Sequence, residues 1–173
     1  MNGFDKSILE VGDALLYYGQ SPVVSPQRRA DFVDWSIAVK TGYWLSHIEI
    51  YDGEGMSVAS RNGIGVNRYP LRLDGLVLVR RPVGIIDRET AEKWFQREAR
   101  GQKYDFKGLL CFWLAVRQGS HAKMFCSEFA LRWYRKAQIQ PLNPDVDADR
   151  TAPCEFYKTA NFATIWQLQN WNP

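Results

Sequence analysis

The sequence feature that most constrains the fold is the stretch LSHIEIYDGEGMSVAS at residues 45–60. Two short runs of strand-forming residues flank the segment DGEG at 52–55. A glycine-rich break between two such runs is typical of a β-hairpin, because glycine adopts the backbone conformations that tight turns require. We therefore predict two antiparallel strands joined by a turn at 52–55.

The first strand of this hairpin carries His47 and Glu49, on which a functional interpretation depends. Side chains alternate between the two faces of a strand, so Ile48 and Ile50 share one face while His47 and Glu49 share the other. The isoleucines mark the buried face, and we expect His47 and Glu49 on the opposite one. A histidine on a strand is more often structural than catalytic, so its role depends on its neighbours.

The rest of the chain places strands before helices, which predicts the α+β class. Asp87 is a favoured helix N-cap and Gly101 a favoured stop, so we expect one helix between them. We also predict a strand in 8–18 that is entered through a turn at Gly12–Asp13, and a second strand at 75–82. A loop is expected at 19–34, a helical segment at 103–116 and a helix at 126–137. The pattern at 154–169 does not distinguish helix from strand.

Length and composition indicate a single domain. With 173 residues, of which 46% are hydrophobic, the chain can bury one sizeable core, so we predict one domain over 1–173. The net charge is +3 and the basic residues are scattered, which argues against a nucleic-acid partner. We see neither a long apolar stretch nor a secretory signal, so we expect no transmembrane segment and a cytoplasmic or non-classically delivered protein.

The cysteines Cys111, Cys126 and Cys154 are irregularly spaced, which favours free thiols over a disulfide framework or a zinc site. We expect neither a metal nor an organic cofactor. Cys126 begins an amphipathic helix in MFCSEFALRW at 124–133. It is either a buried structural cysteine or a nucleophile, since the N–H groups at a helix start favour a thiolate and can stabilise an oxyanion.

A nucleophilic cysteine needs a base, and the chain has two histidines. His121 lies in the polar segment QGSHAK, where we expect an exposed loop, and His47 lies in the predicted hairpin. Glu128, in the first turn of the predicted helix, would oppose a thiolate at Cys126 unless its side chain points away.

The order of these motifs resembles the circularly permuted papain-like cysteine hydrolases of the NlpC type, a group related to lecithin retinol acyltransferase-like proteins. The resemblance implies a papain-like fold, with an antiparallel sheet or small barrel packed against helices and the nucleophile at a helix N-terminus. The matching stretches are GDALLYY (12–18), SHIEIYDGEG (46–55), GIGV (63–66), GQKYDFKGLL (101–110), FCSEFA (125–130) and, more weakly, TAPCEFYKT (151–159).

The resemblance assigns the catalytic roles. Cys126 matches the nucleophile and His47 the general base. Relatives often carry the third polar residue, which orients the histidine, on the next strand, but this chain has Ser-Val-Ala-Ser at 57–60. Glu49 is the carboxylate closest to His47 on its face, so we nominate it, with Ser60 as the reserve.

Two further residues are expected around the nucleophile. Tyr104, in the GxxY segment that precedes Cys126, resembles a tyrosine that lines the site in NlpC-type enzymes, although a core aromatic is an equal alternative. Ser127 follows the nucleophile at the helix start. We assign both to substrate binding or to the oxyanion site.

The function implied by the resemblance is hydrolysis of amide bonds through a Cys-His acyl-enzyme mechanism. The substrate is expected to be a cell-wall peptide or peptidoglycan fragment, with a phage or secretion apparatus as a partner for delivery. One alternative is a lipid or acyl-ester hydrolase or acyltransferase, with an acyl cleft formed by aromatic residues. Another is a non-catalytic binding module on the same fold. The aromatic residues concerned are Tyr43, Trp44, Phe112 and Trp113.

Overall fold

The computed structural model describes residues 4–18, 39–61, 64–105, 123–169 and 171. Predictions made for Cys111, His121, the loop at 19–34 and most of the segment at 103–116 lie outside these ranges. The described part is a mixed α+β structure, which confirms the predicted class. None of its helices combines the length and apolar character needed to cross a membrane.

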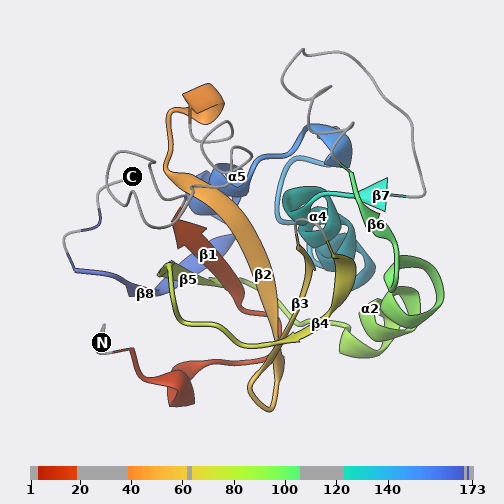
Figure 1. Ribbon diagram of the computed structural model, residues 1–173, viewed down its shortest axis with the longest axis horizontal. Coiled ribbons are helices and arrows are strands. Elements are labelled where there is room, and N and C mark those ends of the chain that lie inside the picture. Colours follow the sequence, from red (N-terminus) through yellow and green to blue (C-terminus); the bar gives the residue numbers. More distant parts are fainter. Residues whose placement is uncertain (1–3, 19–38, 62–63, 106–122, 170, 172–173) are drawn as a thin grey trace.

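A six-stranded antiparallel sheet forms the centre of the structure, with the strand order β4-β3-β2-β1-β5-β8. A separate parallel pair joins β6 to β7. The strands are β1 (Ala14–Tyr18), β2 (Leu45–Gly53), β3 (Met56–Arg61), β4 (Gly65–Pro70), β5 (Leu76–Pro82), β6 (Lys103–Tyr104), β7 (Lys123–Met124) and β8 (Phe162–Gln167). The hairpin predicted at 45–60 is therefore confirmed as β2 and β3 (Figure 1).

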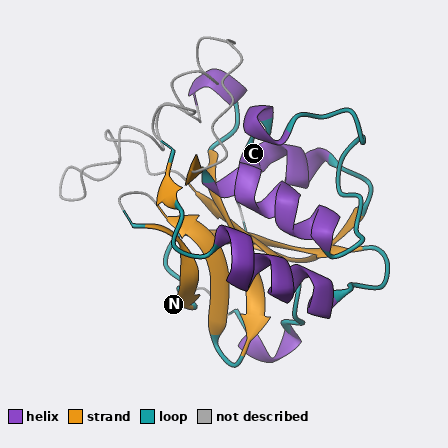
Figure 2. Ribbon diagram, turned by 90° about the vertical axis from the view of Figure 1, so that its right-hand side faces the viewer, coloured by secondary structure: helices purple, strands orange, loops and turns teal. Residues whose placement is uncertain are grey.

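The main helices gather on one side of the sheet (Figure 2). A single apolar core joins Leu16, Ile48 and Ile50 of the sheet to Phe129 and Trp133 of the central helix. This arrangement confirms the predicted apolar stripe of that helix. The helical elements are η1 (Lys6–Ile8), α2 (Arg88–Trp94), the π-helical turn η2 (Phe95–Ala99), α4 (Cys126–Lys136), η3 (Ala148–Arg150) and α5 (Pro153–Lys158).

The opposite face of the sheet is buried as well. Leu15, Tyr17, Leu76 and Val79 form a second apolar cluster there. Because β4 and β5 lie on opposite sides of the three strands β3, β2 and β1, the connection 71–75 has to cross this face, and Figure 1 shows it passing in front of the sheet. We call this connection the β4–β5 strap.

The strap explains one wrong prediction. The alternation of β2 was expected to leave His47 and Glu49 on an open face, but His47 is 8% exposed and Glu49 is fully buried. The sequence pattern identifies the isoleucine side correctly but gives no sign that a distant connection covers the other. β2 is therefore a central strand with two buried faces.

Several element boundaries differ from the prediction. Within 8–18 the strand β1 begins at Ala14, directly after the turn predicted around Gly12–Asp13, and residues 8–13 are not strand. Lys103 and Tyr104 form a strand instead of beginning a helix. The strand β4 was not predicted. The undecided segment at 154–169 contributes most of α5 and then β8, which pairs with β5.

Both ends of the helix predicted between Asp87 and Gly101 are confirmed. The Asp87 carboxylate accepts a hydrogen bond from the Thr90 N–H at 3.0 Å, which is a side-chain N-cap. Gly101 has a positive φ of 83°, as expected for a glycine that follows a helix end. The last turn is a π-helix, so the element is less regular than predicted.

Candidate active site

The candidate site lies where β2 and β3 separate. The two strands pair at Gly53↔Met56, Tyr51↔Ser57 and Ile50↔Val58. Within the described residues, β2 and β3 form no partner pair beyond Ile50 and Val58. β2 nevertheless extends back to Leu45 and β3 extends on to Arg61. Figure 1 shows the strands meeting at the hairpin turn and diverging away from it. The diverging ends leave backbone and side-chain groups that another element can contact.

The start of α4 contacts both diverging strands. The Cys126 thiol lies 3.8 Å from the carbonyl oxygen of Ser46 on β2. The Ser60 hydroxyl on β3 donates a hydrogen bond of 2.6 Å to the carbonyl oxygen of Met124, two residues before the thiol. The cysteine is thus brought to β2 across a sequence separation of 80 residues. The Ser60 hydroxyl, the reserve candidate for orienting His47, thus has its hydrogen bond with Met124, while Glu49 contacts His47.

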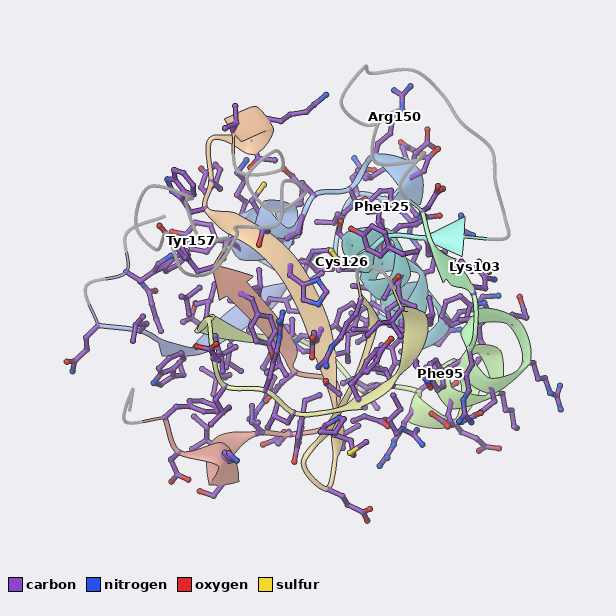
Figure 3. The ribbon with its side chains drawn as sticks, in the orientation of Figure 1. Phe95, Lys103, Phe125, Cys126, Arg150 and Tyr157 are labelled. Carbon is purple, nitrogen blue, oxygen red and sulfur yellow. The ribbon has the colours of Figure 1, made fainter. Side chains whose placement is uncertain are left out.

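Cys126 is the first residue of α4, as the sequence predicted. Phe125 provides no side-chain cap, and the helical hydrogen bonds begin with the Phe129 N–H donating to the Phe125 carbonyl at 3.0 Å. The N–H groups of residues 126–128 precede this first bond, so they are the groups that a helix start offers to an anion. Figure 3 shows Cys126 at this end of the helix, beside β2. The thiol is buried, being 1% exposed.

His47 interacts with both Cys126 and Glu49. Its Nε2 atom lies 3.1 Å from Oε1 of Glu49, so Nδ1 is the ring nitrogen that Glu49 does not engage. Burial opposes the charged imidazole. The neighbouring Cys126 side chain and the contact with Glu49 outweigh this effect and raise the pKa of His47 to about 9. The surroundings of His47 therefore favour its charged imidazolium form.

Glu49 is the most heavily hydrogen-bonded side chain of the site. The Ser57 hydroxyl donates to Oε2 at 2.6 Å. The Arg61 guanidinium binds both carboxylate oxygens, with Nε 2.9 Å from Oε1 and Nη2 3.0 Å from Oε2. Burial opposes the charged carboxylate, but His47, Arg61 and Ser57 together hold the pKa of Glu49 well below its usual range. Glu49 is therefore a fixed anion beside the imidazole.

Two arginines surround this carboxylate. Arg61 also lies over the ring of Tyr69, 4.2 Å from its centroid. Arg72, on the β4–β5 strap, places Nε 3.5 Å from Oε1 of Glu49 and lies 4.3 Å from the ring centroid of Tyr17. Bidentate binding and stacking of this kind are properties that lysine does not share.

Tyr104 and Ser127 have structural contacts near the nucleophile. Tyr104 is buried and pairs with Met124 in the β6–β7 ladder, so it helps to fix the chain just before Cys126. The Ser127 hydroxyl donates to the Thr151 carbonyl at 2.6 Å and ties α4 to η3. Its side chain is thus engaged, while its N–H remains at the helix start. Their assignment to substrate or oxyanion binding stays a prediction.

Glu128 turns toward its own helix. Its Oε1 atom accepts a hydrogen bond from Nη2 of Arg132, one turn later, at 2.8 Å. Burial is the main reason that its pKa rises to about 7, and the nearby carboxylates of Asp105 and Asp149 act in the same direction. A partly neutral Glu128 opposes the thiolate less than a fully charged one.

The sequence interpretation missed the groups that hold Glu49. Continuing the hairpin register from Tyr51↔Ser57 puts Ser57 and Arg61 on the same face as Glu49, so the hairpin pattern contained a signal for both. Arg72 had no such local signal, because the strap brings it to Glu49 from a connection beyond β4.

The structure thus brings together a thiol at a helix start, an imidazole and a buried carboxylate. No protein family matches the chain, and no curated protein matches it either. The chemistry open to the site therefore follows from the side chains of Cys126, His47 and Glu49.

Proposed function

We propose that this protein is a cysteine hydrolase with a Cys126–His47–Glu49 triad on a papain-like, permuted NlpC-like fold. The single observation that carries the proposal is the two-sided contact of His47, with Cys126 on one side and the buried Glu49 carboxylate on the other. A thiol at a helix start, with a base that is itself oriented by a third group, is the arrangement that covalent catalysis by cysteine requires.

In the proposed reaction the Cys126 thiolate attacks the carbonyl carbon of an amide, and the electron pair of the C=O bond moves to oxygen. The N–H groups at the start of α4 are the donors available to this oxyanion. The tetrahedral intermediate collapses as the His47 imidazolium gives its proton to the leaving amine, which leaves a thioester on Cys126. His47 then takes a proton from water, which attacks the thioester and releases the acid and the thiol.

The proposed substrate is a cell-wall peptide or peptidoglycan fragment. Support for this class comes from the resemblance of the sequence motifs to NlpC-type enzymes. A phage or secretion apparatus would then bring the enzyme to its substrate, and the protein itself would be cytoplasmic or delivered without the classical route. These assignments depend on the cysteine chemistry being correct.

Esters are the alternative substrates, because the same nucleophile and base act on them. Of the aromatic residues considered for an acyl cleft, Phe112 and Trp113 lie outside the described residues. The Tyr43 ring lies 6.1 Å from that of Tyr157, and the Trp44 ring lies 6.0 Å from that of Tyr18. Both are engaged within the protein, which gives the ester alternative no added support. A non-catalytic module is disfavoured by the oriented histidine.

The test is the pH dependence of alkylation by iodoacetamide, measured by peptide mass spectrometry. We expect Cys126 to react well below pH 8 and faster than Cys111 and Cys154, since burial raises the pKa of Cys154 to about 11. His47→Ala should abolish the advantage. Equal reactivity of Cys126 in wild type and His47→Ala would refute the proposal. With that pair established, peptidoglycan fragments are the first substrates to assay, with Cys126→Ala as the inactive control.

A further inference from the structure

The charged side chains around Glu49 include more positive than negative groups in the proposed active form. The Cys126 thiolate and the His47 imidazolium form one neutral pair in the proposed function. Glu49 and Arg61 form a second, because Arg61 binds both oxygens of the carboxylate. Arg72 adds a further positive charge, and Glu49 is the one carboxylate paired with it among the described residues. The site therefore carries one cation in excess.

The position of Arg72 leaves part of its guanidinium available. Its side chain is 45% exposed, compared with 21% for Arg61. Its contact with Glu49, from Nε at 3.5 Å, is longer than either of the two contacts made by Arg61. Its stem is nevertheless held in place, because the guanidinium lies over the Tyr17 ring and the Tyr17 hydroxyl donates to the Arg72 carbonyl at 3.1 Å.

Tyr17 links this arginine to the catalytic histidine. The ring centroids of Tyr17 and His47 are 5.8 Å apart, and Tyr17 is the partner of His47 in the β1–β2 ladder. Arg72 is therefore a half-exposed, fixed cation one aromatic ring away from the imidazole. A preorganised guanidinium of this kind favours a carboxylate as its counterion.

We propose that Arg72 is a specificity-determining residue of this site, and that the substrate carries a carboxylate that pairs with the Arg72 guanidinium beside His47. The inference rests on the proposed cysteine chemistry and narrows its substrate to anionic amides or esters. In this arrangement Arg61 keeps Glu49 charged, and Arg72 attracts the substrate.

The experiment compares two reagents of nearly equal size, iodoacetate and iodoacetamide, at Cys126. In both reactions the thiolate forms an S–C bond and iodide leaves, so the reagents differ in the carboxylate alone. We expect Arg72→Met, which keeps an aliphatic stem over Tyr17, to lower the iodoacetate-to-iodoacetamide rate ratio at least about threefold. The rate ratio is the quantity compared, because both reagents react with the same thiolate and any effect of the substitution on Cys126 itself cancels in the ratio.

Two further variants make the result specific. Arg72→Lys retains the charge and should retain most of the rate ratio. Arg97→Gln removes one positive charge from an exposed position on η2 and should leave the ratio unchanged. Circular dichroism shows whether each variant is folded before it is assayed.

The outcomes separate the two proposals. If Cys126 reacts no faster than the other cysteines and independently of His47, the proposed function fails. If that reactivity is intact but Arg72→Met and wild type have the same rate ratio, the assignment of Arg72 is overturned while the triad stands. An equal loss of ratio in Arg97→Gln also overturns it, because the effect would then come from net charge.

Discussion

Arg61 binds Glu49 through both carboxylate oxygens, at 2.9 and 3.0 Å, and thereby neutralises a carboxylate that has no solvent exposure. A buried anion without a cation would protonate or turn away, and His47 would lose its acceptor. The orientation of the histidine therefore depends on an arginine that does not touch it. This dependence leads to the first two predictions.

Glu49→Gln tests the orienting carboxylate. The amide keeps the size of the side chain but removes the negative charge that stabilises the imidazolium, so the thiolate should form at higher pH. We expect iodoacetamide alkylation of Cys126 at pH 6.5 to slow at least about tenfold, the effect of one pKa unit. Glu98→Gln, at an exposed position of η2, serves as the control and should react like wild type. An unchanged rate in Glu49→Gln would remove Glu49 from the site.

Arg61→Met tests the buried ion pair as a structural element. Removing Arg61 takes away two charge-assisted hydrogen bonds and leaves the buried carboxylate with His47, Ser57 and the longer contact from Arg72, which should cost about 2 kcal/mol in the free energy of unfolding measured with urea. Adding Glu49→Gln to the Arg61→Met protein should then cost much less than Glu49→Gln alone, because the two side chains act as a unit. Additive effects of the two substitutions would contradict the pairing.

The pH dependence of stability should report the His47–Cys126 contact. The pKa of His47 is raised from 6.5 to about 9 in the folded protein. Stability from this group is therefore fully present below pH 6.5 and is lost as the pH rises toward 9. Cys126→Ala removes the negative charge that contributes to the shift, so its unfolding free energy should fall less over this interval. Parallel pH profiles for the two proteins would count against the contact.

Glu128 should change the stability with pH in the direction opposite to that of a carboxylate whose pKa is lowered by folding. Its pKa is raised to about 7, so the stability that it contributes is present below its unfolded value of 4.5 and is lost as the pH rises through 7. The free energy of unfolding of Glu128→Gln and of wild type is measured with urea at pH 4.5 and at pH 8. The difference between the two proteins should favour the variant more at pH 8 than at pH 4.5. A larger relative gain at pH 4.5 would show that the contact with Arg132 dominates instead.

Gly12 combines a backbone conformation that favours glycine with a close neighbouring side chain, that of Ile86. Its φ is 96°, and an added Cβ would lie 2.1 Å from Cδ1 of Ile86. Gly42 also has a positive φ, 71°, but an added Cβ there meets no atom within 4 Å. We expect Gly12→Ala to reduce the unfolding free energy by about 2 kcal/mol more than Gly42→Ala, since both share the backbone strain. Equal costs would mean that Ile86 moves aside.

The parts of the site that sequence patterns predict are those that depend on local chain geometry. The glycine-rich turn fixes the hairpin, so the placement of His47 and Glu49 on one face followed from it. The amphipathic pattern of α4 put Cys126 at a helix start. Both features need only a few neighbouring residues to be recognised.

The remaining features depend on how distant segments meet. The strap that buries Glu49 exists because β4 and β5 lie on opposite sides of β1, β2 and β3. Local sequence patterns do not predict this strand order. For the same reason Arg72 was not identified. The pairing of β8 with β5 likewise decides the structure of a C-terminal segment whose own pattern is ambiguous.

The order of the site residues along the chain has a consequence for how the protein is made. His47, Glu49, Arg61 and Arg72 all precede β5, whereas Cys126 begins α4, 80 residues after its contact on β2. A ribosome therefore releases the base and both arginines before it has synthesised the thiol. The Cys126 thiol reaches β2 only when the start of α4 packs between the open ends of β2 and β3. A product terminated before residue 126 carries the base without the reactive group, so in our proposal it is inert from the outset.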